Sequence, residues 1–304
     1  MNELPDDTDR LQRFYFQRFN ARGQLVMLDH TLAELLARRD YPDPVLELLG
    51  QMMCAVAMIA DGLNWPGSVA LQSKGGSLRT SLAEHRPGGL MRAIARPEGE
   101  DGFELPDDAS IDSLIGAGQL ALSLIPADDD RRNQPYQGLV AWEHDRLADN
   151  LRNYFATSEQ LDTRFLLYAD RKHARGLLLQ RLPGGERDDF VDETLQQEFW
   201  ERTSARIDGT VPAELLGNSP QALLARLFRD DSLVLAPPQP LLFACTCNRE
   251  KTGSVLRMLG REDMLELLEE RGCIEVTCEF CGQLYRYDAL ETHLELSGND
   301  LTKH

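Results

Sequence analysis

The sequence predicts an α+β protein: an N-terminal layered α/β domain, a helical middle connector and a small, cysteine-rich C-terminal domain. Three observations lead to this prediction. In residues 1–183, apolar residues follow strand and helix periods, with Gly and Pro between the runs. In residues 184–233 they become sparse and keep helical spacing. Five of the six cysteines fall in residues 234–304. We take these three ranges as the domains.

The strands of the first domain are predicted from short runs of Leu, Val and Ala bounded by Gly, Pro or Asp. Several runs are close enough to form hairpins, and helices separate the others, which is typical of a layered α+β domain. The expected strands are residues 24–29, 68–74, 120–126, 138–143, 164–170 and 175–183.

Helices are predicted at residues 31–39, 42–65 and 147–160. The second faces the core, because its apolar residues recur at steps of three and four. Cys54 lies in its most apolar run, residues 52–60, and behaves there as a small buried hydrophobe. That run is too short to span a bilayer.

The connector is predicted to contain helices at residues 190–207 and 219–231. Ser219 and Pro220 give the second helix a strong start, since Ser suits the N-cap and Pro the first helical position. With so few apolar residues, we expect the connector to have a modest core of its own. Residues 235–240, LAPPQP, form a stiff, extended break before the last domain.

The cysteines of the last domain form a C-x-C pair and a C-x-x-C pair. Four thiolates suit the tetrahedral coordination of Zn²⁺, and Gly282 can relax the backbone after the second pair. A helix-like segment, residues 261–272, separates the pairs, and residues 273–287 resemble a zinc-ribbon hairpin. We therefore predict a zinc site made by Cys245, Cys247, Cys278 and Cys281.

Four other interpretations of these cysteines stay open: a disulfide framework, a thioredoxin-type redox site, an iron–sulfur cluster and unrelated buried thiols. Four protein ligands leave zinc no open position for water, which argues against zinc catalysis. We expect Cys273, His293 and His304 to be non-ligands. Basic residues near the site, such as Arg249 and Arg286, would offset part of its charge or form a solvated face.

A zinc–thiolate site is also an oxidisable switch, because zinc holds the sulfurs as thiolates, the form that attacks oxidants. A structural zinc contributes on the order of 10 kcal/mol to the folding of a small domain. The C-terminal domain has few other large apolar residues. Loss of zinc is therefore expected to unfold it.

The charge balance restricts the possible partners and location. Acidic residues exceed basic ones by 18, which argues against nucleic-acid and anionic-membrane surfaces. The first residues lack the positive-then-apolar order of a secretory signal, so we expect a cytoplasmic protein. The sequence contains no G-x-x-x-x-G-K-[ST] loop for ATP. We also find no catalytic framework, and predict no catalytic residues and no enzyme.

The chain resembles the redox-regulated holdase chaperones of the 33-kDa heat-shock protein family. CTC and CEFC match the cysteine pattern of that family. Four further segments are similar to its characteristic ones: DRLQRFYFQRFNARGQLVML, YQGLV, YFATSEQLDT and GLLLQRLPG. Ala21 before the Arg-Gly signature, Ser77 and Leu78 in a turn, and the extra Cys273 depart from the pattern. The extra thiol leaves in doubt which disulfides form on oxidation.

The resemblance implies an ATP-independent chaperone of the stress response that is zinc-bound and inactive when reduced. It implies that oxidation forms the disulfides Cys245–Cys247 and Cys278–Cys281, releases zinc and unfolds the C-terminal region and the connector. The exposed apolar surface would then bind unfolded or aggregation-prone client proteins, and the oxidised form would be a homodimer. The alternative function is a non-catalytic zinc-ribbon adaptor that docks on another macromolecule.

Overall fold

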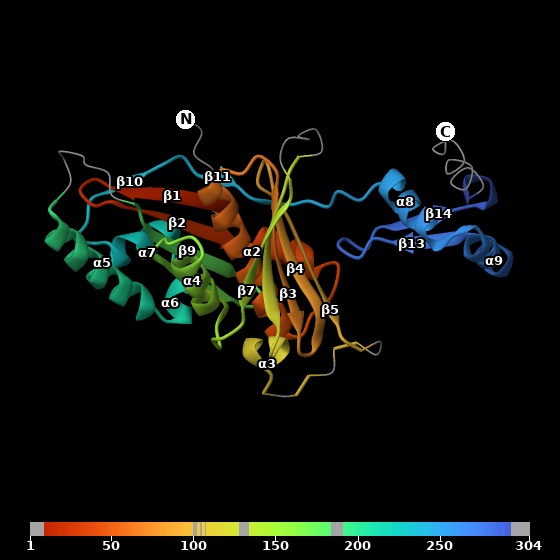
Figure 1. The fold of residues 1–304 in the computed structure, drawn as a ribbon, viewed down its shortest axis with the longest axis horizontal. Coiled ribbons are helices and arrows are strands. Elements are labelled where there is room, and N and C mark those ends of the chain that lie inside the picture. The colour runs from red at the N-terminus through yellow and green to blue at the C-terminus, as the bar shows by residue number, and fades with distance from the viewer. Residues whose placement is uncertain are drawn as a thin grey trace. The chain divides into compact units, whose positions relative to one another are not determined.

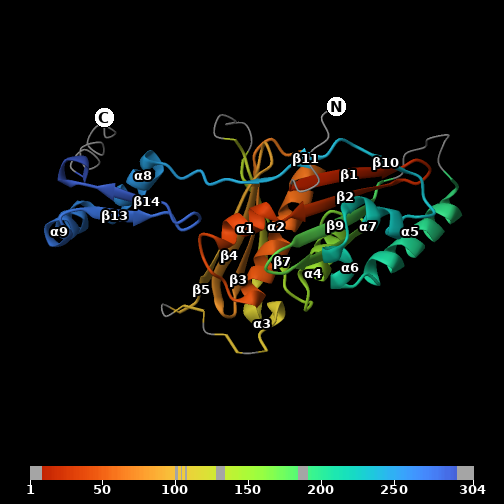
Figure 2. The ribbon, with the colours of Figure 1, turned by 180° about the vertical axis from the view of Figure 1, so that it is seen from behind.

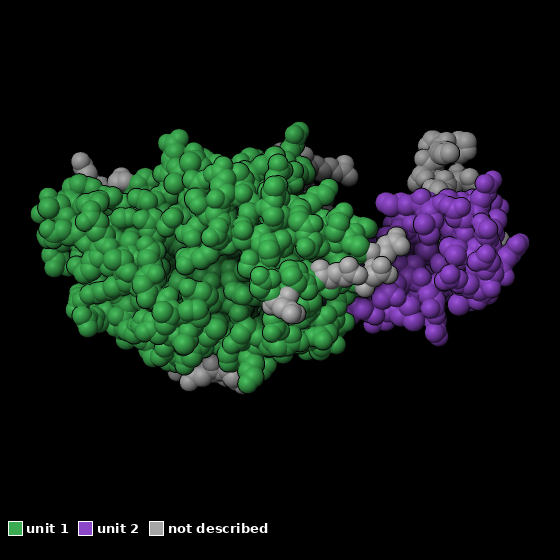
Figure 3. All heavy atoms as spheres, turned by 90° about the horizontal axis from the view of Figure 1, so that it is seen from below, with its two compact units in different colours: residues 1–243 green, residues 244–304 purple. Residues whose placement is uncertain are grey.

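The computed structural model describes residues 9–99, 102–103, 105–106, 108–127, 134–183 and 191–292. The chain forms two compact units, residues 1–243 and 244–304, which Figure 3 distinguishes by colour. The mixed α+β fold predicted from the sequence is confirmed. The three-domain division stays a prediction, and residues 184–190, where the connector would begin, lie outside the described residues.

One sheet of the first unit has the strand order β10-β1-β2-β9-β8, with β11 also paired to β1. The pairs β1–β2, β2–β9 and β8–β9 are antiparallel, so segments far apart in sequence lie side by side (Figure 1). Gly23 is required on β2, because a Cβ there would lie 2.0 Å from the ring of Phe14 on β1. The strands are β1 (Arg10–Phe16), β2 (Ala21–Leu28), β8 (Thr163–Ala169), β9 (Ala174–Arg181), β10 (Leu233–Leu235) and β11 (Gln239–Pro240).

The second sheet has the order β12-β5-β4-β3-β6-β7. All its pairs are antiparallel except β12–β5, which is parallel. Three of its strands, β4, β5 and β12, were not among the predicted ones. The strands are β3 (Ser68–Gly75), β4 (Leu78–Arg86), β5 (Leu90–Pro97), β6 (Gln119–Ile125), β7 (Tyr136–Ala141) and β12 (Leu242–Phe243).

Helix α2 (Asp43–Leu63) lies between the two sheets, as both ribbon views show (Figures 1 and 2). Its apolar residues join the larger of the two cores in this unit, and Cys54 is fully buried there as predicted. Among the described residues it alone has the length and hydropathy of a membrane span, but 83% of that window is buried inside the protein, as in a core helix. The other helices on this core are α1 (His30–Leu36), α3 (Ile111–Ile115) and α4 (Leu147–Thr157).

The predicted connector folds as three helices along the first sheet (Figure 2): α5 (Glu193–Asp208), α6 (Pro212–Gly217) and α7 (Pro220–Leu227). Ser219 caps α7 and Pro220 opens it, as expected. The apolar residues of these helices pack together with those of β1, β2, β8 and β9 in one shared core. Among the described residues, the connector therefore does not have a separate core, because its buried apolar residues all belong to the core that it shares with the sheet. They are Phe199, Trp200, Ile207, Leu215, Leu223, Leu224, Leu227 and Phe228.

Residues 236–243, which we call the strap, run from the connector helices to the second unit. The prolines keep the strap extended, as predicted, but it is hydrogen-bonded rather than free. The N–H of Leu241 donates to the carbonyl of Asp9, 2.9 Å away, and that of Leu242 donates to the carbonyl of Gly89, also 2.9 Å away. The strap thus pairs with β1 in one sheet and β5 in the other.

The second unit contains α8 (Arg249–Leu259), α9 (Arg261–Arg271) and the hairpin of β13 (Ile274–Thr277) and β14 (Leu284–Tyr287). The predicted helix and hairpin are present, and α8 was not predicted. Among residues 244–292, the described part of this unit, the core has only four buried apolar residues, namely Leu256, Met264, Ile274 and Tyr287. So small a core gives the unit little hydrophobic stabilisation, and further cross-links are expected to hold it.

Candidate metal centre

Two chain segments carry the cysteines of the second unit. Cys245 and Cys247 follow the strap in extended backbone, and Cys278 and Cys281 lie in the turn between β13 and β14. The turn is closed by the N–H of Gly282, which donates to the carbonyl of Cys278 at 2.7 Å. Gly282 has φ 69°, a left-handed conformation that favours glycine and lets both sulfurs of the turn face the same side.

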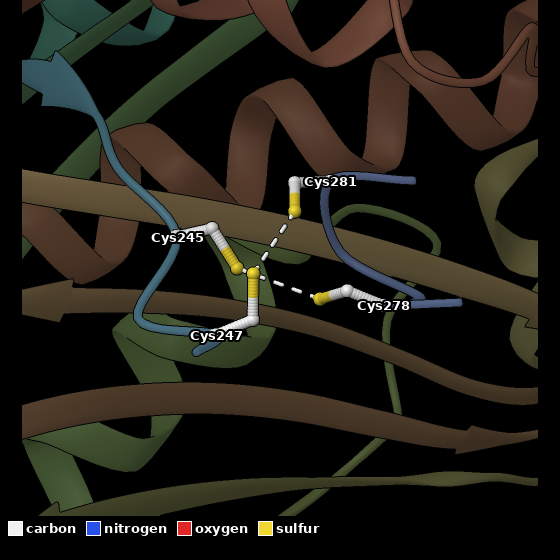
Figure 4. A group of neighbouring side chains, drawn as sticks. All are labelled: Cys245, Cys247, Cys278 and Cys281. Carbon is white, nitrogen blue, oxygen red and sulfur yellow. Dashed lines mark hydrogen bonds between the residues drawn. The ribbon is translucent and has the colours of Figure 1, made fainter. Parts of the chain in front are cut away.

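The four sulfurs converge on one point (Figure 4), and all lie within 4.8 Å of one another. The Sγ atoms of Cys245 and Cys278 are 3.6 Å apart, and those of Cys247 and Cys281 are 3.3 Å apart. Tetrahedral zinc with bonds of about 2.3 Å would place its sulfur ligands about 3.8 Å apart. The donor set and its spacing therefore fit a zinc ion.

Without a cation, the four thiols cannot all ionise in such a small space. Burial raises the pKa of Cys281 to about 12 and also raises the pKa of Cys278. Burial opposes ionisation of Cys245 as well, but hydrogen bonds from the backbone N–H of Cys247 and from neighbouring thiols outweigh it and lower its pKa to about 7. A divalent cation would supply the positive charge that four thiolates need.

Tyr285, on β14, also contacts this group, and the sequence analysis did not select it. Its hydroxyl donates a hydrogen bond to the Sγ of Cys247 at 3.2 Å. That bond, followed by burial, raises the pKa of Tyr285 to about 12. Its position four residues after Cys281 was visible in the sequence, but nothing there indicated which way the ring points.

The remaining candidates lie outside the cluster. Cys273 lines a separate cavity of about 320 Å³ with Leu267, Arg271, Ile274 and Glu275. Among the residues that the structure describes, no further Cys, His, Asp or Glu joins the four sulfurs. His293 and His304 lie outside those residues. Arg249 and Arg286 form ion pairs with Glu291 and Glu275.

An α+β body followed by a small unit with four convergent cysteines defines a class of protein: one with a cysteine-only module suited to a structural metal. The chain belongs to the Hsp33 protein family, whose model matches residues 9–288. The family resemblance seen in the sequence is thereby confirmed.

Named relatives agree with this assignment. The chain is 38% identical over 293 residues to a "33 kDa chaperonin" of Pseudomonas savastanoi pv. phaseolicola, covering 96% of this chain and 94% of the relative. It is 40% identical over 287 residues to one of Azotobacter vinelandii, covering 94% and 93%. These relatives are named as chaperonins and not as enzymes.

The fold also matches a solved structure. The crystal structure of the 33 kDa chaperonin of Thermotoga maritima superposes with a TM-score of 0.77 at 22% identity, covering 96% of this chain and 99% of that one. At this identity the match supports the fold alone.

Proposed function

We propose that this chain is a redox-regulated, ATP-independent holdase chaperone of the cytoplasm. Its relatives' name supports a chaperone that binds unfolded proteins. The observation that carries the regulation is the group of four sulfurs within 4.8 Å in a unit with four buried apolar residues. In our proposal Cys245, Cys247, Cys278 and Cys281 hold Zn²⁺ in the reduced state, and zinc supplies the charge and cross-links that keep this unit folded.

Oxidation would remove these ligands. Each disulfide forms when two thiolates give two electrons to one peroxide, which takes up two protons and leaves as two waters. Two disulfides, Cys245–Cys247 and Cys278–Cys281 by family resemblance, consume all four ligands. The second unit would then lose its main cross-link and unfold.

The connector supplies the apolar surface in this proposal. Its helices cover aromatic and aliphatic side chains of the first sheet, among them Phe14, Phe16 and Leu177. If unfolding of the second unit weakens the docking of these helices, both faces of the shared core become available to clients. In this proposal residues 1–183 form the N-terminal domain, residues 184–233 form the connector, and residues 234–304 form the zinc-binding redox switch. The oxidised form would dimerise through the same apolar surface.

The proposal can be tested with a heat-denatured client followed by light scattering. Zinc-loaded, reduced protein should not suppress aggregation, and peroxide-treated protein should. The variant Cys278→Ser should fail to hold zinc and lose redox control, whereas Cys273→Ser, in the same unit but outside the cluster, should behave like the wild type. Equal suppression by both redox states would exclude the switch, and no suppression by either would exclude the holdase. A second unit that stays folded after oxidation would favour an adaptor.

A further inference from the structure

The four sulfurs of the candidate zinc site have different hydrogen-bond donors. The sulfur of Cys245 accepts from the backbone N–H of Cys247, and that of Cys281 accepts from the backbone N–H of Gln283. The sulfur of Cys278 accepts from the backbone N–H groups of Phe280 and Cys281. The sulfur of Cys247 accepts from a side chain, the hydroxyl of Tyr285. As a side-chain donor, it can be removed by a substitution without disturbing the backbone.

The position of Tyr285 makes this bond a link between the two halves of the site. Tyr285 pairs with Val276 in the hairpin that carries Cys278 and Cys281. Its hydroxyl reaches the C-x-C segment, where it lies 3.2 Å from the sulfur of Cys247. The ring is only partly buried and packs against the small core of the second unit. A Phe at this position would keep the packing and lose only the donor.

A hydrogen bond to a thiolate stabilises its charge and withdraws electron density from the sulfur. Both effects make the sulfur a weaker nucleophile toward peroxide. Donors in the outer shell of a metal site also orient its ligands, and their loss typically costs 10–100-fold in metal affinity. The hydroxyl of Tyr285 therefore lowers the reactivity of Cys247 below the value that this sulfur would have without it.

We propose that Tyr285 is a positioning residue that protects Cys247 from oxidation and so sets the oxidant level at which the site opens. The inference rests on the proposed zinc switch and adds a regulator to it. With its donor in place, Cys247 reacts more slowly than it would without the hydroxyl of Tyr285, so zinc is retained up to a higher peroxide concentration. Without the donor, Cys247 reacts faster with peroxide, and the site opens at a lower peroxide concentration.

Tyr287 provides a matched control. It lies two residues further along the same strand, is 1% exposed, and its hydroxyl lies 2.6 Å from that of Thr252 and donates to the carbonyl of Arg249 at 2.8 Å. Tyr287→Phe thus removes a buried hydrogen bond from the same unit without touching a sulfur. It measures the effect of lost stability alone.

The test uses the zinc-loaded, full-length chain as wild type, Tyr285→Phe and Tyr287→Phe. Each is exposed to limiting peroxide, alkylated at intervals and analysed by mass spectrometry for the oxidised fraction of each cysteine. Zinc release and zinc affinity are measured with a chromogenic chelator. Replacement of zinc by Co²⁺ adds the thiolate-to-metal absorption band, which reports on the sulfurs directly.

In Tyr285→Phe we expect oxidation of Cys247 to be about fivefold faster, the factor expected for one lost hydrogen bond. We also expect zinc affinity to fall roughly tenfold and the cobalt band to shift. Tyr287→Phe should match the wild type in the rate of Cys247 oxidation, in zinc affinity and in the position of the cobalt band. Equal Cys247 oxidation in Tyr285→Phe and the wild type, or the same change in both variants, would overturn the role of Tyr285. Wild-type protein that holds no zinc would instead refute the proposed function.

Discussion

The ring of Phe199 on α5 meets the ring of Phe16 on β1 edge to face, with centroids 4.7 Å apart. Phe199 also stacks on Phe19, with centroids 4.0 Å apart and an interplanar angle of 8°. Phe199 is 1% exposed. This one side chain of the connector therefore makes aromatic contacts both with strand β1 and with the turn that follows it. These two ring contacts attach helix α5 of the connector to the first sheet and its turn.

Phe199→Ala is therefore expected to weaken the docking of the connector by about 3–5 kcal/mol, the usual cost of truncating a buried Phe. Helicity should be lost at lower urea, and the reduced protein should suppress client aggregation in part. The exposed neighbour Glu198 provides the control, since Glu198→Ala should change stability by less than about 0.5 kcal/mol. Circular dichroism across a urea series measures both variants; equal midpoints would contradict the prediction.

Removal of zinc is expected to unfold the second unit, because four buried apolar residues cannot hold two helices and a hairpin. A strong chelator should abolish the helical signal of α8 and α9 and make residues 244–292 sensitive to protease. Cys278→Ser should show the same sensitivity without chelator. Cys273→Ser should stay resistant until zinc is removed, and a chelator-treated unit that keeps its helicity would refute the structural role of zinc.

We expect the strap to determine whether unfolding of the second unit spreads to the connector helices. Leu241 is 2% exposed in the main core, whereas its neighbour Leu242 is 53% exposed. Leu241→Ala is expected to cost about 2–5 kcal/mol and to lower the peroxide concentration that releases the connector. Leu242→Ala should have little effect on either quantity. Hydrogen exchange of α5 and α7 during peroxide titration measures the release, and identical titrations for the two variants would argue against a role of the strap.

Asp29 is expected to stabilise the body in a pH-dependent way. Burial opposes its charge, but hydrogen bonds from Arg175 and His173 outweigh that effect and hold the pKa of Asp29 below its usual value of 3.8. A lowered carboxyl pKa stabilises the fold above about pH 3.8, and this contribution is lost as the pH falls through the folded-state pKa. Arg175, with a side chain 5% exposed, would be left without this partner in Asp29→Asn.

Asp29→Asn should lower the free energy of unfolding at pH 7 by about 2 kcal/mol. This is less than for a fully buried pair, because the side chain of Asp29 is 38% exposed. Urea unfolding of the wild type and the variant at pH 7 and pH 3 measures it. The difference between the two proteins should shrink at pH 3. Asp40→Asn is the control, because Asp40 pairs with Arg171 on the surface at 85% exposure. A difference independent of pH would contradict the assignment.

Periodicity and residue chemistry alone determined much of this protein. The core helix around Cys54, the mixed α+β character and the hairpin before Tyr287 all follow local rules, and the structure has them at the predicted places. The C-x-C and C-x-x-C spacings likewise predicted that Cys245, Cys247, Cys278 and Cys281 would come together. Local spacing is sufficient within each pair, whereas the meeting of the two pairs, 33 residues apart between Cys245 and Cys278, was inferred from the four ligands that zinc needs.

Only the tertiary structure decided how distant segments meet. The connector looked poor in core residues because its partners, such as Phe16 and Leu177, lie far away in the sequence on β1 and β9. The strap's bonds to Asp9 and Gly89 depend on strand pairings that no local pattern encodes. The hydroxyl of Tyr285 finds Cys247 across 38 residues. Such contacts arise from the packing of whole elements, which sequence periodicity does not determine.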